Sequence, residues 1–189
     1  MIEAIFLAFL AAKLRKYKLK PLFKEWTIYL VLFFAFLYMY LDYSVFHENY
    51  SLLKYSAVFK FSYICVFSIL VFKHRQYIAG FIGAVCVTLC GVLNSIVVNA
   101  NGGKMPVFPA LSYITGYLKP DAFEKLARYD SVHVLGGSAA KLAFLADRID
   151  LGYGVLSIGD VFFRLMAFVI IYSVVKSLNG NSVAVYKAD

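Results

Sequence analysis

Four apolar runs, each about 20 residues long, constrain this chain more than any other feature. They cover residues 27–46, 55–72, 77–98 and 155–175. An α-helix rises about 1.5 Å per residue, so about 20 residues cross the ~30 Å hydrocarbon core of a bilayer. The chain is also 62% hydrophobic, against ~45–50% for ordinary soluble domains. The sequence therefore predicts an all-α fold, a polytopic membrane helix bundle that forms a single membrane domain.

Basic residues gather beside the apolar runs rather than on one folded face. Six of them lie in residues 13–24, and the formal net charge of the chain is +8. Because Lys and Arg are retained on the cytoplasmic side, this stretch predicts cytoplasmic N- and C-termini. Residues 73–75, Lys176 and Lys187 then lie inside, and residues 99–154 lie outside a bacterial cell membrane. Lys and Arg beside the apolar runs are attracted to anionic lipid headgroups. This pattern predicts the lipid bilayer as a partner and excludes nucleic acid.

Two shorter segments are predicted to be helical without spanning. Residues 1–12 reach roughly 18 Å as a helix, so we expect an interfacial helix, with a half-span as the alternative. In the outer segment, Asp121 and Glu124 have the spacing of a capping box and predict a helix over residues 122–129. Ser138 is in position to cap a second helix over residues 139–146.

Two acids are the predicted catalytic residues, Asp147 and Asp160. Adjacent carboxylates cannot easily both ionise, so one holds a proton, and an acid and a base that share a water can hydrolyse a peptide bond. A structural alternative is open for both. Ser157 precedes Asp160 at capping-box spacing, which would make Asp160 part of a helix cap. Asp147 would be a surface acid that lies beside Arg148. Asp150 is a further acid, which is either a helper of this site or unrelated to it.

Four polar residues are predicted to bind or position a substrate: His133, Asn101, Arg148 and Arg164. Arg164 follows Asp160 by one helical turn, which is favourable for an ion pair. His133 follows Asp130 by three residues and can pair with it. Because no companion His or Cys stands at ligand spacing, we predict neither a metal nor another cofactor.

Three motifs resemble those of a known family. They are Asn-Gly-Gly-Lys-Met-Pro-Val at residues 101–107, His133 together with Leu-Ala-Asp at residues 145–147, and Ser-Ile-Gly-Asp at residues 157–160. Together they are similar to a bacterial family of small integral-membrane proteins of unknown function. The resemblance covers most of the chain and implies a multi-pass membrane fold, but no activity.

A weaker resemblance is to lipoprotein signal peptidases. A Gly pair at residues 136–137, an Asp-Arg pair at residues 147–148 and Ser-Ile-Gly-Asp at residues 157–160 fall in the order of that family. The resemblance implies four spans, both termini inside, and catalytic roles for Asp147 and Asp160. The chain departs from the family at Ser157, where an Asn is expected, and at residues 47–54, which are too short for the extracytoplasmic cradle.

Two functions of different classes follow from these patterns. The first is an aspartate-dependent hydrolase or peptidase that cuts a membrane-inserted peptide or lipopeptide at the outer leaflet. The second is a non-catalytic membrane subunit or scaffold, whose first span would pack its aromatic side chains against a partner membrane protein. These side chains are Phe33, Phe34, Phe36, Tyr38 and Tyr40. A transporter is disfavoured because the inner halves of the spans hold few polar side chains.

Overall fold

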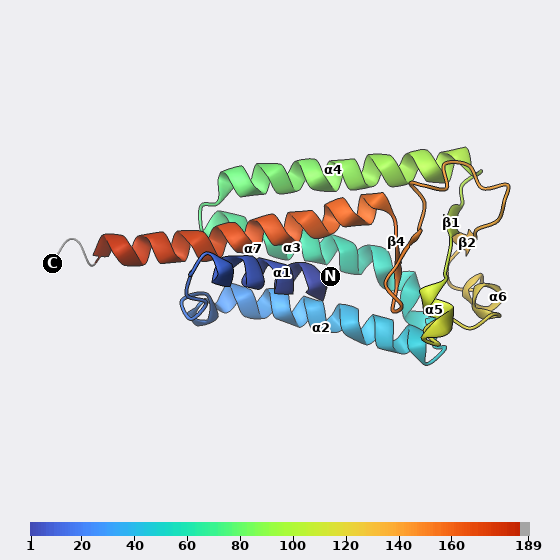
Figure 1. Ribbon diagram of the computed structural model, residues 1–189, viewed down its shortest axis with the longest axis horizontal. Helices are drawn as coiled ribbons and strands as arrows, with labels where there is room; N and C mark the ends of the chain where they lie inside the picture. The colour runs from blue at the N-terminus through green and yellow to red at the C-terminus, as the bar shows by residue number, and fades with distance from the viewer. Residues whose placement is uncertain (186–189) are drawn as a thin grey trace. The chain divides into compact units, whose positions relative to one another are not determined.

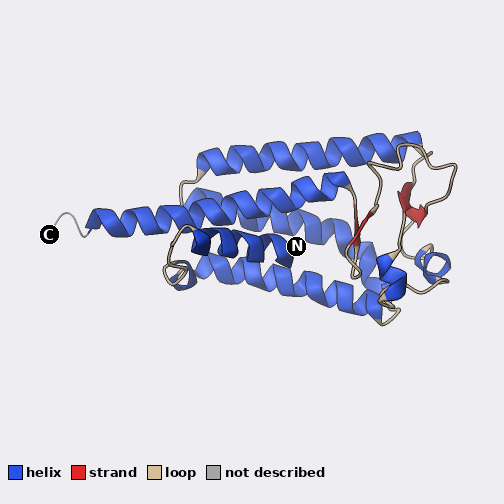
Figure 2. Ribbon diagram, in the orientation of Figure 1, coloured by secondary structure: helices blue, strands red, loops and turns tan. Residues whose placement is uncertain are grey.

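The computed structural model describes residues 1–185 of the chain, so Lys187 lies outside the described residues. About 65% of the protein is helical, and the described part contains seven α-helices and only short strands (Figures 1 and 2). Its α-helices are α1 (Ile2–Leu14), α2 (Trp26–Phe46), α3 (Ser56–Lys73), α4 (Tyr77–Ala100), α5 (Leu111–Ile114), α6 (Ala122–Leu126) and α7 (Ile158–Val185). Its strands are β1 (Met105–Val107), β2 (His133–Leu135), β3 (Ile149–Asp150) and β4 (Val155–Leu156).

Four helical segments are long and apolar enough to cross a membrane. They are Trp26–Phe46, Tyr50–Lys73, Tyr77–Ala100 and Ile158–Gly180, where the second includes the 3-10 turn Tyr50–Tyr55 before α3. This confirms the predicted all-α polytopic membrane protein. The last span begins three residues later than its apolar run, because β4 pairs with β3 in an antiparallel ladder.

The chain folds as two compact units. Unit 1 comprises residues 1–37, 59–86 and 163 onward, and unit 2 comprises residues 38–58 and 87–162. Each of the four long helices contributes one part to each unit.

In unit 1, the N-terminal helix α1 lies along α7. Its buried side is made of small and branched residues, Ala4, Ile5, Ala8 and Ala12. Three contacts join the N-terminal segment to α7 in the same order along both: Glu3 Oε2 with Arg164 Nε at 3.8 Å, the Tyr17 ring with the Tyr172 ring at 6.2 Å, and Lys18 N with Asn179 Oδ1 at 2.8 Å. Whether α1 is an interfacial helix or a half-span stays a prediction.

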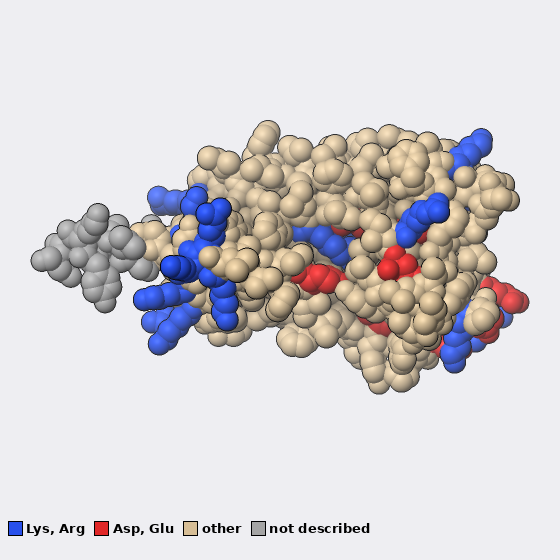
Figure 3. All heavy atoms as spheres, in the orientation of Figure 1, with Lys and Arg blue, Asp and Glu red and all other residues tan. Residues whose placement is uncertain are grey.

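Lys and Arg side chains gather at one end of unit 1 (Figure 3). The exposed Lys and Arg residues of unit 1 include Lys13, Arg15, Lys16, Lys18, Lys20, Lys24, Lys73, Arg75 and Lys176. They come from three separate parts of the chain: the segment before α2, the end of α3 with the turn after it, and α7. That this end faces the cytoplasm stays a prediction.

Unit 2 holds the polar segment between α4 and α7, and its core begins at the end of α4. Val97, Met105 and Ala146 are buried together, and Val98, Phe108 and Leu145 pack against them. Strands β1 and β2 are parallel, with Met105 opposite His133. The predicted helix over residues 122–129 forms as the shorter α6.

The predicted helix over residues 139–146 is wrong. The structure has turns there, and Leu142 adopts a left-handed conformation with φ of 53°, which a helix does not tolerate. The side chain of Asn101 accepts a hydrogen bond from Lys141 N and donates one to Lys141 O. The backbone N–H and C=O groups of Lys141 are therefore bonded to a distant side chain instead of taking part in a helix.

A charged cluster joins the turn after α2 to α6. The carboxylate of Glu48 pairs with Lys119 and with Lys125, whose Nζ lies 2.5 Å from Glu48 Oε2. Lys125 also pairs with Asp121 at 2.8 Å. Hydrogen bonds from both lysines lower the pKa of Glu48 to about 2.

Candidate functional site

Strand β1 brings together two side chains that lie 14 residues apart in the sequence. On one side, β2 places His133 opposite Met105. On the other, Val107 bridges to Asp147: Asp147 N donates to Pro106 O at 3.2 Å, and Phe108 N donates to Asp147 O at 2.8 Å. Proline keeps the residue before it extended, which suits a strand at this place. The pairing of β1 with β2 on one side and with Asp147 on the other therefore sets the approach of His133 to Asp147.

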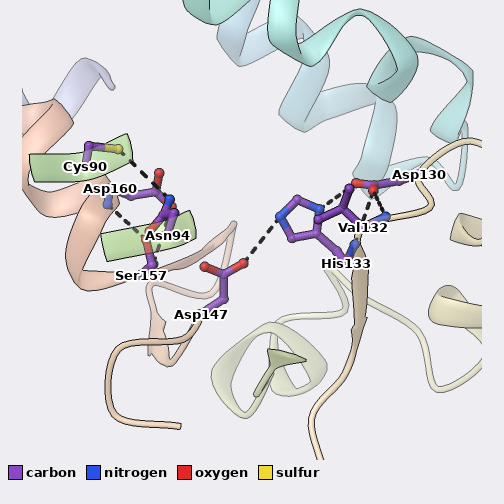
Figure 4. Close-up of polar contacts among 8 residues, drawn as sticks. All are labelled: Cys90, Asn94, Asp130, Val132, His133, Asp147, Ser157 and Asp160. Atoms are coloured by element: carbon purple, nitrogen blue, oxygen red, sulfur yellow. Dashed lines mark hydrogen bonds and ion pairs between the residues drawn. The ribbon is translucent and has the colours of Figure 1, made fainter. Parts of the chain in front are cut away.

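His133 lies between two carboxylates (Figure 4). Its Nδ1 is 2.6 Å from Asp130 Oδ2, and its Nε2 is 3.6 Å from Asp147 Oδ2. The Asp147 side chain is only 6% exposed. Asp130 Oδ1 also accepts hydrogen bonds from Val132 N at 2.8 Å and His133 N at 3.2 Å. Asp130 therefore holds both the backbone and the imidazole of His133 in place.

The charge on Asp130 decides which nitrogen of the His133 ring carries a proton. Burial raises the pKa of Asp130, but the His133 side chain and the two backbone N–H groups outweigh this and lower it to about 2. An ionised Asp130 only accepts hydrogen bonds, so Nδ1 carries a proton and donates it. The other nitrogen, Nε2, then faces Asp147 beyond the range of a direct hydrogen bond. The Asp147 carboxylate is therefore close enough to stabilise a positive charge on the His133 ring electrostatically.

Asp160 lies in the first turn of α7 and forms a reciprocal cap with Ser157. Ser157 N donates to Asp160 Oδ2 at 3.3 Å, and Asp160 N donates to Ser157 Oγ at 3.0 Å. This is the capping box that the sequence offered as the structural alternative. Asp147 and Asp160 both lie in unit 2, and their pairing as a catalytic dyad stays a prediction.

Asn94, to which the sequence analysis assigned no role, fixes the first turn of α7 to α4. Ser157 Oγ donates to Asn94 Oδ1 at 2.9 Å. A Cβ added to Gly159 would lie 2.2 Å from that Oδ1, so the two helices approach closely here. The available signal was an amide side chain inside an apolar run, which is costly unless it has a partner.

The other predicted positioning residues have separate contacts. Asn101 Nδ2 donates to Val97 O at 2.9 Å as well as to Lys141 O, so it ties the end of α4 to a distant turn. The guanidinium of Arg148 lies 5.4 Å from the centre of the Phe108 ring. Arg164 belongs to unit 1, where its contact is with Glu3. Binding or positioning of a substrate by these residues stays a prediction.

Asp150 organises a loop. Its carboxylate accepts hydrogen bonds from Ala110 N, Ser112 N, Ser112 Oγ and Gly152 N at 2.6–2.8 Å. Burial raises the pKa of Asp150, and these bonds lower it below its usual value. Within residues 1–185 no three His, Cys, Asp or Glu residues form a group suited to a metal ion.

Comparison with known proteins places the chain by family alone. A family model described as a family of unknown function, DUF5317, matches residues 19–172. This agrees with the predicted resemblance to a family without a known activity, while the resemblance to lipoprotein signal peptidases stays a prediction. No curated protein and no solved structure matches the chain.

Proposed function

We propose that this chain, which belongs to the DUF5317 family of unknown function, is a membrane hydrolase. The proposal rests on its geometry, in which Asp147 and His133 form an acid–base centre. The observation that carries this proposal is the buried Asp147 carboxylate 3.6 Å from His133 Nε2, with Nδ1 held by Asp130. A carboxylate that orients a histidine, which in turn faces a reacting group, is a recurrent design for proton transfer.

Each of the three residues has one role in the proposed reaction. Asp130 keeps the proton on Nδ1, so Nε2 is the ring nitrogen that takes a proton from an attacking water. The water oxygen bonds to the carbonyl carbon of the substrate, and the C–N bond breaks. The proton returns to the leaving amine, and Asp147 stabilises the transient imidazolium. The substrate class is a membrane-inserted peptide or lipopeptide, cut at the membrane surface on the side of unit 2.

In the two-aspartate form of the proposal, Asp160 is the second carboxylate beside Asp147. The two forms differ in what Asp160→Asn does. An amide keeps an oxygen that can accept the hydrogen bond from Ser157 N, so the cap survives while the acid is lost. Retained activity in this variant assigns the chemistry to His133, and lost activity assigns it to the acid pair.

The test uses full-length protein in liposomes, with single-span peptides that carry a fluorophore and a quencher on either side of their interfacial segment. Cleavage by the wild type is expected, with loss of at least about 100-fold in Asp147→Asn, as for removal of other acid–base groups. The matched control is Glu124→Gln, which changes an exposed acid of the same segment and should keep full activity. Equal cleavage by wild type and Asp147→Asn, or none by the wild type, refutes the proposal.

A second candidate function is a non-catalytic subunit, favoured by the exposed face of α2. Six aromatic residues follow one another at three- and four-residue spacing, and each is more than half exposed: Trp26, Tyr29, Phe33, Phe36, Tyr40 and Tyr43. Such spacing presents one continuous stripe to a neighbouring helix. A stoichiometric partner that is lost with Phe33→Leu and Phe36→Leu together, but kept with Phe81→Leu on α4, would support this function.

A further inference from the structure

A short loop of unit 2 exposes apolar side chains beside a basic residue. It is the 141–145 loop, with the sequence Lys-Leu-Ala-Phe-Leu. Phe144 is 68% exposed and Leu142 is also exposed, while Lys141 next to them faces solvent. In water this arrangement leaves most of a large aromatic ring exposed, which is unfavourable.

The exposure of these side chains is built into a rigid turn. Asn101 holds both backbone groups of Lys141, through Oδ1 at 2.8 Å and Nδ2 at 2.9 Å. At the other end of the loop, Leu145 packs against the buried cluster that contains Val97 and Ala146. Both anchors lie at the C-terminal end of α4, so the loop is fixed over that end and projects Phe144 outward.

Helix α4, whose end carries both anchors, has an exposed apolar surface of its own. Val92 is 49% exposed and Ile96 is 45% exposed, on a helix that is long and apolar enough to span. In a bilayer such a surface faces acyl chains. The loop is anchored just past the end of this span, where hydrocarbon gives way to headgroups.

We infer that the 141–145 loop inserts Phe144 and Leu142 into the lipid surface beside α4, with Lys141 at the level of the lipid phosphates. Apolar residues with a flanking lysine are the composition of segments that lie at this boundary. The lipid surface is the partner because the loop with these exposed apolar side chains is anchored at the end of a helix long and apolar enough to span. The inference rests on packing and exposure, so it holds whether or not Asp147 catalyses a reaction.

The test places a single tryptophan at the tip of the loop. Trp26 is the only tryptophan of the chain, so Trp26→Phe gives a background without indole emission. Phe144→Trp in this background adds the probe, and Glu124→Trp on α6 is the matched exposed control from the same segment. Both proteins are reconstituted in phosphatidylcholine vesicles whose acyl chains carry bromine near the headgroup end.

Phe144→Trp should emit at shorter wavelength than Glu124→Trp, lose most of its emission to the brominated lipid, and be protected from aqueous iodide. Glu124→Trp should show the opposite pattern. Because Phe144 is exposed and the change keeps an aromatic ring, the fold is expected to tolerate it, and circular dichroism checks this. The inference is overturned when brominated lipid quenches Phe144→Trp no more than Glu124→Trp, as it would if a protein partner or water covered the loop.

Discussion

The close approach of α4 and α7 at Gly159 makes a sharp prediction about stability. A Cβ at position 159 would lie 2.2 Å from Asn94 Oδ1 and 2.9 Å from the backbone oxygen of Cys90. Both contacts are shorter than real Cβ atoms make, and a backbone oxygen cannot swing aside. Gly159→Ala must therefore push the first turn of α7 away from α4 and stretch the bond between Ser157 Oγ and Asn94 Oδ1.

Three contributions set the size of the effect. Overpacking at a tight contact costs about 1–3 kcal/mol, and loss of one buried hydrogen bond costs about 0.5–1.5 kcal/mol. The replacement of glycine by alanine inside a helix returns about 0.5–1 kcal/mol. The expected net loss is about 2 kcal/mol in the free energy of unfolding, or roughly thirtyfold in the unfolding equilibrium constant.

The assay is reversible unfolding in detergent micelles, followed by circular dichroism as SDS is added. Gly91→Ala on α4 is the control, because a Cβ there meets nothing within 4 Å. This variant should be as stable as the wild type or slightly more stable. If Gly159→Ala and Gly91→Ala give the same free energy of unfolding, the start of α7 does not pack against α4 as described.

Two further predictions concern single residues. Arg75→Gly, in the exposed turn between α3 and α4, should raise the free energy of unfolding by about 0.5 kcal/mol, because left-handed backbone (φ of 53° at Arg75) costs non-glycine residues about 1–2 kcal/mol and the entropy of glycine offsets about 0.5–1 kcal/mol of this; a lower melting temperature than that of the wild type would contradict this. Glu48→Gln should lower the melting temperature at neutral pH by removing the pairs with Lys119 and Lys125. Since the folded pKa of Glu48 is depressed to about 2 from 4.5, the stabilisation is present above about pH 4.5 and is lost as the pH falls toward about 2. The gap between wild type and Glu48→Gln should close over that range, and a gap of the same size at every pH would contradict the account.

Much of the fold could be predicted because the relevant signals are local. An apolar run of about 20 residues forms a spanning helix whatever its neighbours are, since lipid leaves the backbone no other hydrogen-bond partners. The cap formed by Ser157 and Asp160 is local in the same way, because both partners lie within four residues. The spacing predicts the bond without knowledge of the rest of the chain.

The helix predicted over residues 139–146 failed for the opposite reason. Its apolar residues and the capping position of Ser138 favour a helix in isolation. Asn101, which is 40 residues away, takes the backbone groups of Lys141 instead. A hydrogen bond between distant residues overrides a weak local preference, and the sequence contains no signal of that distance.

The sequence by itself determined the four apolar helices, the basic residues beside them and the capped start of α7. Each of these features depends on residues within one or two helical turns. Only the tertiary structure decided that His133 stands between Asp130 and Asp147, that α1 follows α7, and that Asn94 meets Gly159. These contacts depend on the pairing of β1 with β2 and on the packing of helices. Such register is set by the sum of many weak contacts between distant segments, and no short pattern of residues encodes that sum.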